Sequence, residues 1–318
     1  MRETVRGKTR IVTVTLNPAI DRVIIVEKLR VGEVQVGQTV LRVPGGKGVN
    51  VSHALVALNV PTIATGFLGA DNRVDFLPLL SNPMIGDQFI SMPGRTRENI
   101  TLADPNGVDT HIRDRGLAVD AKALEQIRDL LGELATKQTT VVFSGSIPPG
   151  MTGRDFAALV DLCISAGSRV VVDTSDEALE AMRDKKLWIL APNERELARL
   201  SGRDLPSRQE QLAAAKQLLK RVEMVLFSCG KNGAYILGKG FASCARANLN
   251  PEWVRNTVGC GDVLLAAFLG GLWLNKSPRE ALVLAVAAAA ASAAHPATAT
   301  WDDSILEELL TKVDVQDV

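Results

Sequence analysis

The stretch Asn256-Thr-Val-Gly-Cys-Gly-Asp262 runs without a break into the apolar run Val263-Leu-Leu-Ala-Ala-Phe-Leu269. The apolar run predicts a buried helix over Val263–Leu274, so a glycine-rich loop and one carboxylate stand at the helix N-terminus. Glycines let backbone N–H groups approach an anion, and the positive end of the helix dipole stabilises negative charge. Asp262 is therefore a candidate base for an attacking hydroxyl, and the plainer alternative is that Asp262 or Thr257 caps the helix.

Outside this stretch, short apolar and β-branched runs alternate with helical segments. Continuous apolar runs that are too short for helices are typical of parallel strands buried between two layers of helices. The expected strands are Arg10–Leu16, Thr139–Phe143, Arg169–Val172, Leu187–Leu190 and Met224–Phe227. The expected helices are Val49–Leu58, Ala121–Leu134, Arg154–Ser165, Ser207–Lys220, Val263–Leu274 and Pro278–Ala294. The predicted fold class is therefore α/β, with a mainly parallel central sheet.

Two segments, residues 22–43 and 89–115, depart from this rhythm because polar and apolar residues alternate in them. Alternation predicts short antiparallel strands with one open face, which could pair into a small lid. No fixed-period repeat, low-complexity tract or Pro/Ser-rich linker divides the sequence. Residues 1–318 are therefore predicted to form a single domain that carries a lid.

Composition narrows the classes of function. Lys and Arg total 36 and Asp and Glu total 36, so no bulk charge draws the protein to nucleic acid or to an anionic membrane. The alanine-rich run 281–294 is shorter than the about 20 residues that span a bilayer and predicts a close-packed helix. The charged segment Met1–Arg10 lacks the features of a secretory signal, which predicts a cytoplasmic protein. The scattered cysteines indicate reduced buried thiols: Cys163, Cys229, Cys244 and Cys260.

Two motifs lie in the first fifty residues, near the end of the first expected strand and before the first expected helix. Open α/β sheets bind their ligands beyond the carboxyl ends of their strands. Asn17 and Asp21 come after the first strand and could hold the hydroxyls of a polyol, although an Asx-Pro turn is a common plain alternative. Lys47 and Asn50 lie in Pro44-Gly-Gly-Lys-Gly-Val-Asn50, whose spacing is not that of the P-loop. They could donate to sugar hydroxyls or an anion, or the segment could be a glycine-rich turn with a solvated lysine.

Further polar residues lie in the expected lid and at later strand ends. The Arg97 guanidinium suits a phosphate, although a lone arginine on a strand is usually solvated. Asn193 and Glu196 could order Mg²⁺ and its waters, or they could simply begin a helix. The turn Phe227-Ser-Cys-Gly-Lys-Asn-Gly233 could embrace a nucleotide or join a hairpin. Each signal is weak alone, and together they indicate one active site at the carboxyl ends of the strands.

From Thr15 to about Asp303 these motifs resemble the PfkB (ribokinase-like) carbohydrate kinases, particularly the 1-phosphofructokinase and tagatose-6-phosphate kinase branch. The resemblance implies a ribokinase-like three-layer sandwich with a small antiparallel β lid, and Mg·ATP-dependent phosphoryl transfer to a sugar phosphate. It implies that Asp262 is the catalytic base, with Gly259, Cys260 and Gly261 as the anion hole. By analogy alone, the lid is a possible homodimer contact.

The remaining site residues are implied by the same resemblance. Substrate contacts fall at Asn17, Asp21, Gly45, Gly46, Lys47, Asn50, Asn99 and Ser144, with Arg97 at the phosphate of the substrate. Nucleotide contacts fall at Asn193, Ser228, Gly230, Gly233 and Thr257, and the Mg²⁺ ligands at Asn193 and Glu196.

Several residues depart from the family pattern. Ala191 stands where the family usually has a lysine, Cys260 replaces an alanine, and Val263 replaces a small residue. Arg113 and Arg115 occupy the second lid segment where sugar-phosphate members often have Glu-Ile-Asn, which could reshape the sugar site. The expected reaction converts fructose 1-phosphate to fructose 1,6-bisphosphate. Open alternatives are a tagatose-6-phosphate or fructose-6-phosphate kinase, and a catalytically weak sensor of a sugar phosphate or nucleotide.

Overall fold

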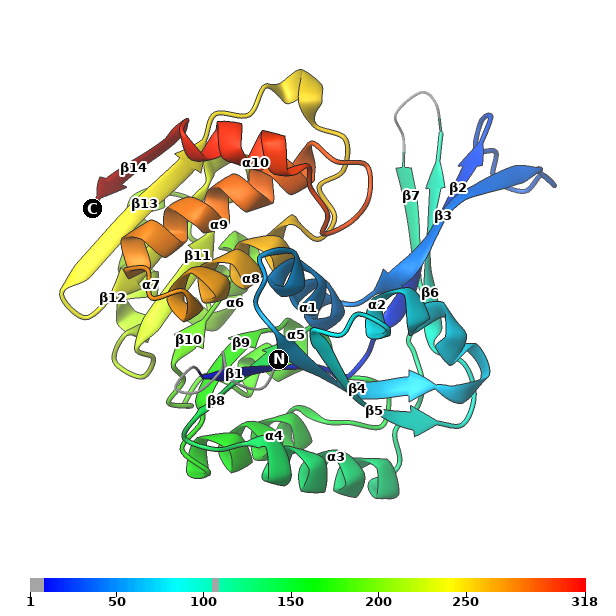
Figure 1. Cartoon of the computed structure of the whole chain (residues 1–318), viewed down its shortest axis with the longest axis horizontal. Coiled ribbons are helices and arrows are strands. Elements are labelled where there is room, and N and C mark those ends of the chain that lie inside the picture. Colours follow the sequence, from blue (N-terminus) through cyan, green and yellow to red (C-terminus); the bar gives the residue numbers. More distant parts are fainter. Residues whose placement is uncertain (1–8, 105–108) are drawn as a thin grey trace.

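Two sheets frame the protein in a computed structural model that describes residues 9–104 and 109–318 (Figure 1). The larger sheet has the order β14-β13-β12-β11-β10-β9-β8-β1-β4-β5 and is parallel from β11 to β5. Its strands are β1 (Arg10–Thr15), β4 (Thr62–Gly69), β5 (Ile85–Met92), β8 (Thr139–Ser144), β9 (Arg169–Asp173), β10 (Ile189–Leu190), β11 (Met224–Ser228), β12 (Ala234–Gly238), β13 (Phe241–Ala247) and β14 (Val313–Asp317). The last three add antiparallel strands at one edge.

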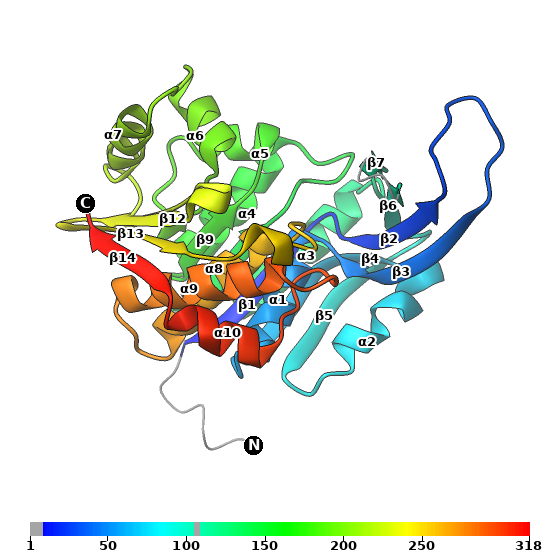
Figure 2. The same cartoon turned by 90° about the horizontal axis from the view of Figure 1, so that it is seen from above.

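Helices cover both faces of this sheet, because successive strand residues point to opposite sides. Val141 and Phe143 belong to one buried cluster with α3, α4, α5, α6 and α7, whereas Val142 belongs to another with α1, α8, α9 and α10. Figure 2 shows the sheet between these two helical layers. The helices are α1 (Lys47–Ala57), α2 (Leu77–Leu80), α3 (Ala121–Leu134), α4 (Gly153–Ser165), α5 (Asp176–Glu180), α6 (Glu194–Ser201), α7 (Arg208–Leu218), α8 (Cys260–Trp273), α9 (Pro278–Ala293) and α10 (Asp303–Leu310). The predicted three-layer α/β sandwich is confirmed.

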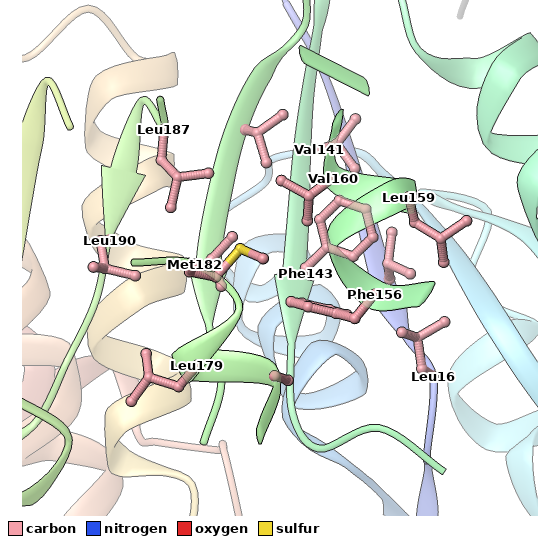
Figure 3. Packing of buried hydrophobic residues seen from close by; sticks show 14 of the residues in the cluster. Leu16, Val141, Phe143, Phe156, Leu159, Val160, Leu179, Met182, Leu187 and Leu190 are labelled. Atoms are coloured by element: carbon pink, nitrogen blue, oxygen red, sulfur yellow. The ribbon is translucent and has the colours of Figure 1, made fainter. Parts of the chain in front are cut away.

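Aromatic packing anchors the layer that carries α4. The rings of Phe143 on β8 and Phe156 on α4 meet edge to face, with centroids 5.5 Å apart (Figure 3). Leu159 and Val160 extend the same cluster along the helix. Side chains of this size stabilise the fold by about 1.5–3 kcal/mol each when they leave water, so this layer holds β8 and β9 firmly.

The smaller sheet, here called the lid, consists of β2 (Ala19–Val26), β3 (Gly37–Gly45), β6 (Arg97–Ala103) and β7 (Asp109–Arg113). Its order is β3-β2-β6-β7, and two antiparallel hairpins are joined by parallel pairing of β2 with β6. The lid rises away from the main sheet in Figure 1. The small antiparallel lid predicted from the sequence is therefore present.

The boundaries of the lid need one correction. The second expected lid segment began at residue 89, but Phe89–Met92 belongs to β5 at the edge of the main sheet. An edge strand with one covered face shows the same alternation as a lid strand, so the pattern does not separate the two. Residues 105–108 of that segment, and residues 1–8 of the charged N-terminal segment, lie outside the described residues.

The helix that follows the glycine-rich loop begins three residues earlier than expected, at Cys260. Asp262 is thus in the first turn of α8 rather than before it. The alanine-rich α9 packs against α8 so closely that a Cβ added at Gly271 would lie 2.9 Å from the Cα of Ala281. In the part of the chain that the structure describes, no helix is long and apolar enough to cross a membrane.

Candidate active site

Asp262 is the buried carboxylate of the site. It is 4% exposed, and its carboxylate accepts hydrogen bonds from Asn50 Nδ2 at 2.7 Å and Lys47 Nζ at 3.2 Å. Both donors come from the first turn of α1, which begins at Lys47 and packs against α8. Gly259 caps α8 with φ +80°, a conformation that suits glycine. The N-termini of two helices therefore converge on one carboxylate.

Lys47 is held between two carboxylates. Its Nζ donates to Asp262 and also to Asp173, at 2.9 Å from Oδ2 and 3.1 Å from Oδ1. Asp173 ends β9, is buried, and accepts a hydrogen bond of 3.0 Å from Ser144 Oγ at the end of β8. Asp173 is not among the site residues expected from the sequence, although an acidic residue directly after the Arg169–Val172 strand occupies the usual position of a ligand-binding side chain.

Burial and charge act in opposite directions on this cluster. Burial raises the pKa of the Asp262 carboxyl, and the Lys47 ammonium and the Asn50 amide oppose that rise. Burial alone would lower the pKa of Lys47, but Asp173 and Asp262 outweigh it and raise the pKa. Lys47 therefore stays protonated, and Asp262 is a carboxylate that gains from accepting a proton.

The first turn of α8 faces an open space beside Asp262. Helices leave their first N–H groups without intrahelical acceptors, and a Cβ added at Gly261 would meet nothing within 4 Å. Gly261 lines a pocket of about 80 Å³ together with Lys47 and Asp173. Cys260, the neighbouring residue, is half-buried, and burial raises the pKa of its thiol to about 11. The thiol therefore stays protonated near neutral pH and adds no negative charge at the N-terminus of α8. The free N–H groups of this helix N-terminus can therefore bind an anion.

One wall of the pocket is formed by residues at the end of β11, just after β10 and in the first turn of α6. It includes Ala191, Asn193, Glu196 and Ser228. Asn193 Oδ1 accepts from the N–H groups of Arg195 and Glu196 at 3.0 Å each, and Glu196 Oε2 accepts from the N–H of Asn193. The pair is therefore a capping box of α6 that also borders the pocket. Their nucleotide and metal roles stay predictions.

The expected nucleotide turn joins a hairpin. Gly230 and Gly233 lie between β11 and β12, which pair antiparallel. A Cβ added at Gly233 would lie 2.0 Å from the carbonyl oxygen of Ala245, and φ is +86°, so only glycine fits. Thr257 is exposed before α8. Ser228 lines the pocket, whereas these three residues do not.

The lid brings together a second polar group. Asp21 on β2 and Asn99 on β6 are paired in register, and Asn99 Nδ2 donates to Asp21 Oδ1 at 2.8 Å. Within the described residues, Asn99 Oδ1 is buried and accepts no hydrogen bond. A Cβ added at Gly45 would lie 2.3 Å from Asp21 Oδ2, so glycine makes room for this carboxylate. Burial raises the pKa of Asp21, against the hydrogen bond from Asn99 and the charges of Arg97 and Arg113.

Asn17 and Arg97 bind backbone at the base of the lid. Asn17 Nδ2 donates to the carbonyl of Arg115 at 3.1 Å, and more weakly to Ile147 and Ser146. The Arg97 guanidinium donates to the carbonyls of Asn17 at 2.9 Å, Pro18 at 3.2 Å and Asp114 at 2.8 Å. These bonds hold together the chain segments that connect the lid to the main sheet. Neither sequence pattern predicted this structural role.

Solved structures share this fold. Phosphofructokinase-2 from Escherichia coli, in complex with substrates and products, is 25% identical and has a TM-score of 0.87, covering 95% of this chain and 98% of its own. Ribokinase from Arabidopsis thaliana, complexed with ribose and ATP, is 22% identical with a TM-score of 0.74, covering 95% and 99%, and shows the fold alone. This chain therefore shares its fold with two kinases.

Sequence comparison defines the family. The model of the pfkB family carbohydrate kinases matches residues 8–304, and the chain belongs to this family. The 1-phosphofructokinase of Haemophilus influenzae is 33% identical over 308 residues, which cover 96% of this chain and 97% of the relative. The 1-phosphofructokinase of Escherichia coli strain K12 is 31% identical over 317 residues, covering 96% and 98%. ATP is the co-substrate that the kinase family implies.

Proposed function

We propose that this protein phosphorylates fructose 1-phosphate with ATP to give fructose 1,6-bisphosphate. The choice of fructose 1-phosphate as acceptor follows the relatives, which are 1-phosphofructokinases. The observation that supports phosphoryl transfer is the buried Asp262 at the N-terminus of α8. A carboxylate whose pKa is raised by burial is a better proton acceptor than an exposed one. A cap would not need two side-chain donors from another helix.

The reaction requires one proton transfer and one displacement. The acceptor hydroxyl loses its proton to Asp262, and its oxygen forms a bond to the γ-phosphorus of ATP. The bond from that phosphorus to the β,γ-bridging oxygen breaks, and ADP leaves. The N–H groups of the first turn of α8, at Gly261 and its neighbours, stabilise the negative charge of the phosphoryl group in transit. Lys47 keeps Asp262 ionised until the hydroxyl arrives.

The two sides of the site take different ligands in this proposal. Asp21, Asn99 and Lys47 hold sugar hydroxyls, and the phosphate of the acceptor lies on the side of the lid that carries Arg97. The nucleotide lies along the pocket wall at Asn193 and Ser228 and extends past the pocket to Gly230, Gly233 and Thr257.

Mg²⁺ suits one part of this wall. Burial first, and then the charge of Asp173, raise the pKa of Glu196, so two carboxylates repel each other beside one pocket. A divalent cation relieves that repulsion, and Mg²⁺ prefers such oxygen ligands and retains several waters. Asn193 and Glu196 would hold it, and the ion would neutralise the nucleotide phosphates.

The oligomeric state and the location extend the proposal. Apolar side chains are exposed on the lid at Ile25, Val40 and Ile112, and on the segment that joins β2 to β3 at Val31, Val34 and Val36. Exposed apolar groups of this density mark interaction surfaces, which supports a homodimer formed through the lid. A cytoplasmic location agrees with the use of ATP as co-substrate.

The test of the catalytic assignment is Asp262→Asn. We expect kcat to fall by about 10²–10⁴-fold, because the amide cannot accept the proton, while the KM of the sugar phosphate changes by no more than a few-fold. Asp120→Asn is the matched control, since Asp120 caps α3 by accepting from the N–H of Ala123 at 2.8 Å and should leave turnover intact. Equal turnover in the Asp262 variant and the parent would disprove the role of a base.

The acceptor is tested with a panel of sugar phosphates in a coupled assay of ADP release. A kcat/KM that is highest with fructose 1-phosphate supports the proposal. A higher kcat/KM with tagatose 6-phosphate or fructose 6-phosphate would show that fructose 1-phosphate is not the preferred acceptor. Ala191 at the pocket wall favours the second candidate function, a sensor with little turnover, because no ammonium faces the phosphates from that position. Binding without turnover on every sugar phosphate would support the sensor.

A further inference from the structure

Arg113 is the exposed last residue of β7, the edge strand of the lid. It pairs in register with Asn99, which itself pairs with Asp21 across β6 and β2. Residues that are directly opposite each other on paired strands project from the same face of a sheet. The hydrogen bond between Asn99 and Asp21 confirms this for one pair. The three side chains therefore stand in one row on the face that carries the sugar-side polar groups.

The guanidinium of Arg113 is available for a ligand. In residues 9–104 and 109–318, Arg113 donates no hydrogen bond and forms no ion pair, and it is exposed. The charge of Arg113 acts on both neighbours. It opposes the rise that burial causes in the pKa of Asp21, and it adds to the lowering that burial causes in the pKa of Arg97, which the charge of Asp21 opposes. The positive charges of Arg97 and Arg113 therefore lie close enough to interact, and an anion bound between them would stabilise both.

Arg97 is less available, because three carbonyl oxygens of the lid base occupy its guanidinium. A guanidinium binds phosphate most strongly when two parallel N–H groups are presented together, and the bonds of Arg97 already fix its orientation toward backbone. The free side chain next to it is Arg113. It stands where the sequence departs from the Glu-Ile-Asn pattern, so this contact is a property of this chain.

We propose that Arg113 is the main charged contact for the non-reacting phosphate monoester of the acceptor, and that Arg97 mainly positions the base of the lid. The inference rests on the proposed function, since it concerns the acceptor of the same site. It makes Arg113 a specificity-determining residue, which selects phosphorylated over uncharged sugars and does not take part in the transfer itself.

The experiment compares Arg113→Gln with Arg95→Gln. Arg95 is an exposed arginine just before β6 whose charge acts on Asp75, so its replacement changes net charge equally without touching the row. For Arg113→Gln we expect the KM of fructose 1-phosphate to rise about 10- to 100-fold, as expected for hydrogen bonds to a charged group, with kcat and the KM of ATP within a few-fold of the parent. Arg113→Lys should recover part of the loss, since the charge remains without the fork.

Direct binding separates recognition from turnover. In the Asp262→Asn background, titration calorimetry should show a weaker Kd for fructose 1-phosphate when Arg113 is replaced, and an unchanged Kd for fructose. If the parent phosphorylates fructose 1-phosphate but Arg113→Gln behaves like Arg95→Gln, the inference is wrong and the proposed function stands. If the parent phosphorylates no sugar phosphate, the proposed function fails, and the inference fails with it.

Discussion

Burial disfavours the ionised form of the Asp262 carboxyl. The hydrogen bonds from Asn50 and Lys47 favour the charge of this carboxylate, and Lys47 is shared with Asp173. When the acceptor hydroxyl transfers its proton, the net negative charge of this buried cluster decreases. The cluster therefore favours the protonated product of the transfer, which is what a general base in a buried site requires.

This balance predicts a shifted pH dependence in Lys47→Met. Asp262 must be ionised to act as a base, so kcat falls as the pH drops through its pKa, at a higher pH than for an exposed aspartate. Removal of the ammonium removes a charge that lowers this pKa, so the acidic limb of the kcat profile should move to higher pH. Lys122→Met, an exposed position on α3, is the control. A profile whose acidic limb stays in place would show that Lys47 does not control the ionisation of Asp262.

The residues of the site were predictable to different degrees. Asp262 and Asn50 could be identified because glycines beside a polar residue at a helix start form a local pattern. Asp173 was missed because a single aspartate after a strand has no such neighbours, and only the fold brings it to Lys47. The backbone contacts of Arg97 were equally hidden, since they join segments about 80 and 17 residues away in sequence.

At the scale of the elements, helix α6 combines a structural and a proposed binding role in one pair of residues. The Asn193 side chain caps the helix, and the same residue borders the pocket. The longer helices α1, α3, α4, α7, α8 and α9 were predicted because their periodicity is local. The short helices α2, α5 and α10 and the strands β4 and β12–β14 were not identified, and part of β5 was assigned to the lid. Edge and antiparallel strands depend on their partners in the sheet for stability, and a single sequence does not show the partners.

Substitutions at Asn193 separate the two roles. Asn193→Ser keeps an oxygen that can cap α6 and removes the amide, whereas Asn193→Ala loses both. We expect Asn193→Ala to lower the free energy of unfolding by about 1 kcal/mol and Asn193→Ser to change it much less. Both should need more Mg²⁺ for half-maximal activity. Denaturant titration and Mg²⁺-dependent kinetics check this, and an unaltered Mg²⁺ requirement in both variants would leave Asn193 as a cap alone.

At the scale of the whole molecule, the segment that joins two strands of the lid carries three nearly fully exposed valines. Val31, Val34 and Val36 are 98%, 102% and 95% exposed, on the segment that joins β2 to β3. We expect Val34→Asp combined with Val36→Asp to convert a dimer into monomers, which sedimentation equilibrium would detect. Val74→Asp, at a position 65% exposed outside the lid, should leave the mass unchanged. A parent protein that is monomeric at all concentrations would exclude the lid dimer.

The bonds at the base of the lid also set conditions for protein engineering. Arg97 ties the turn at Asn17 and Pro18 to the chain leaving β7 at Asp114, and Asn17 reaches on to the carbonyl of Arg115. An exchange of lids between two relatives would join the two sequences at the segments that these hydrogen bonds connect. A functional chimaera must therefore take Asn17, Arg97 and the segment after β7 from the same parent. The hydrogen bonds that fix the lid to the main sheet are then kept.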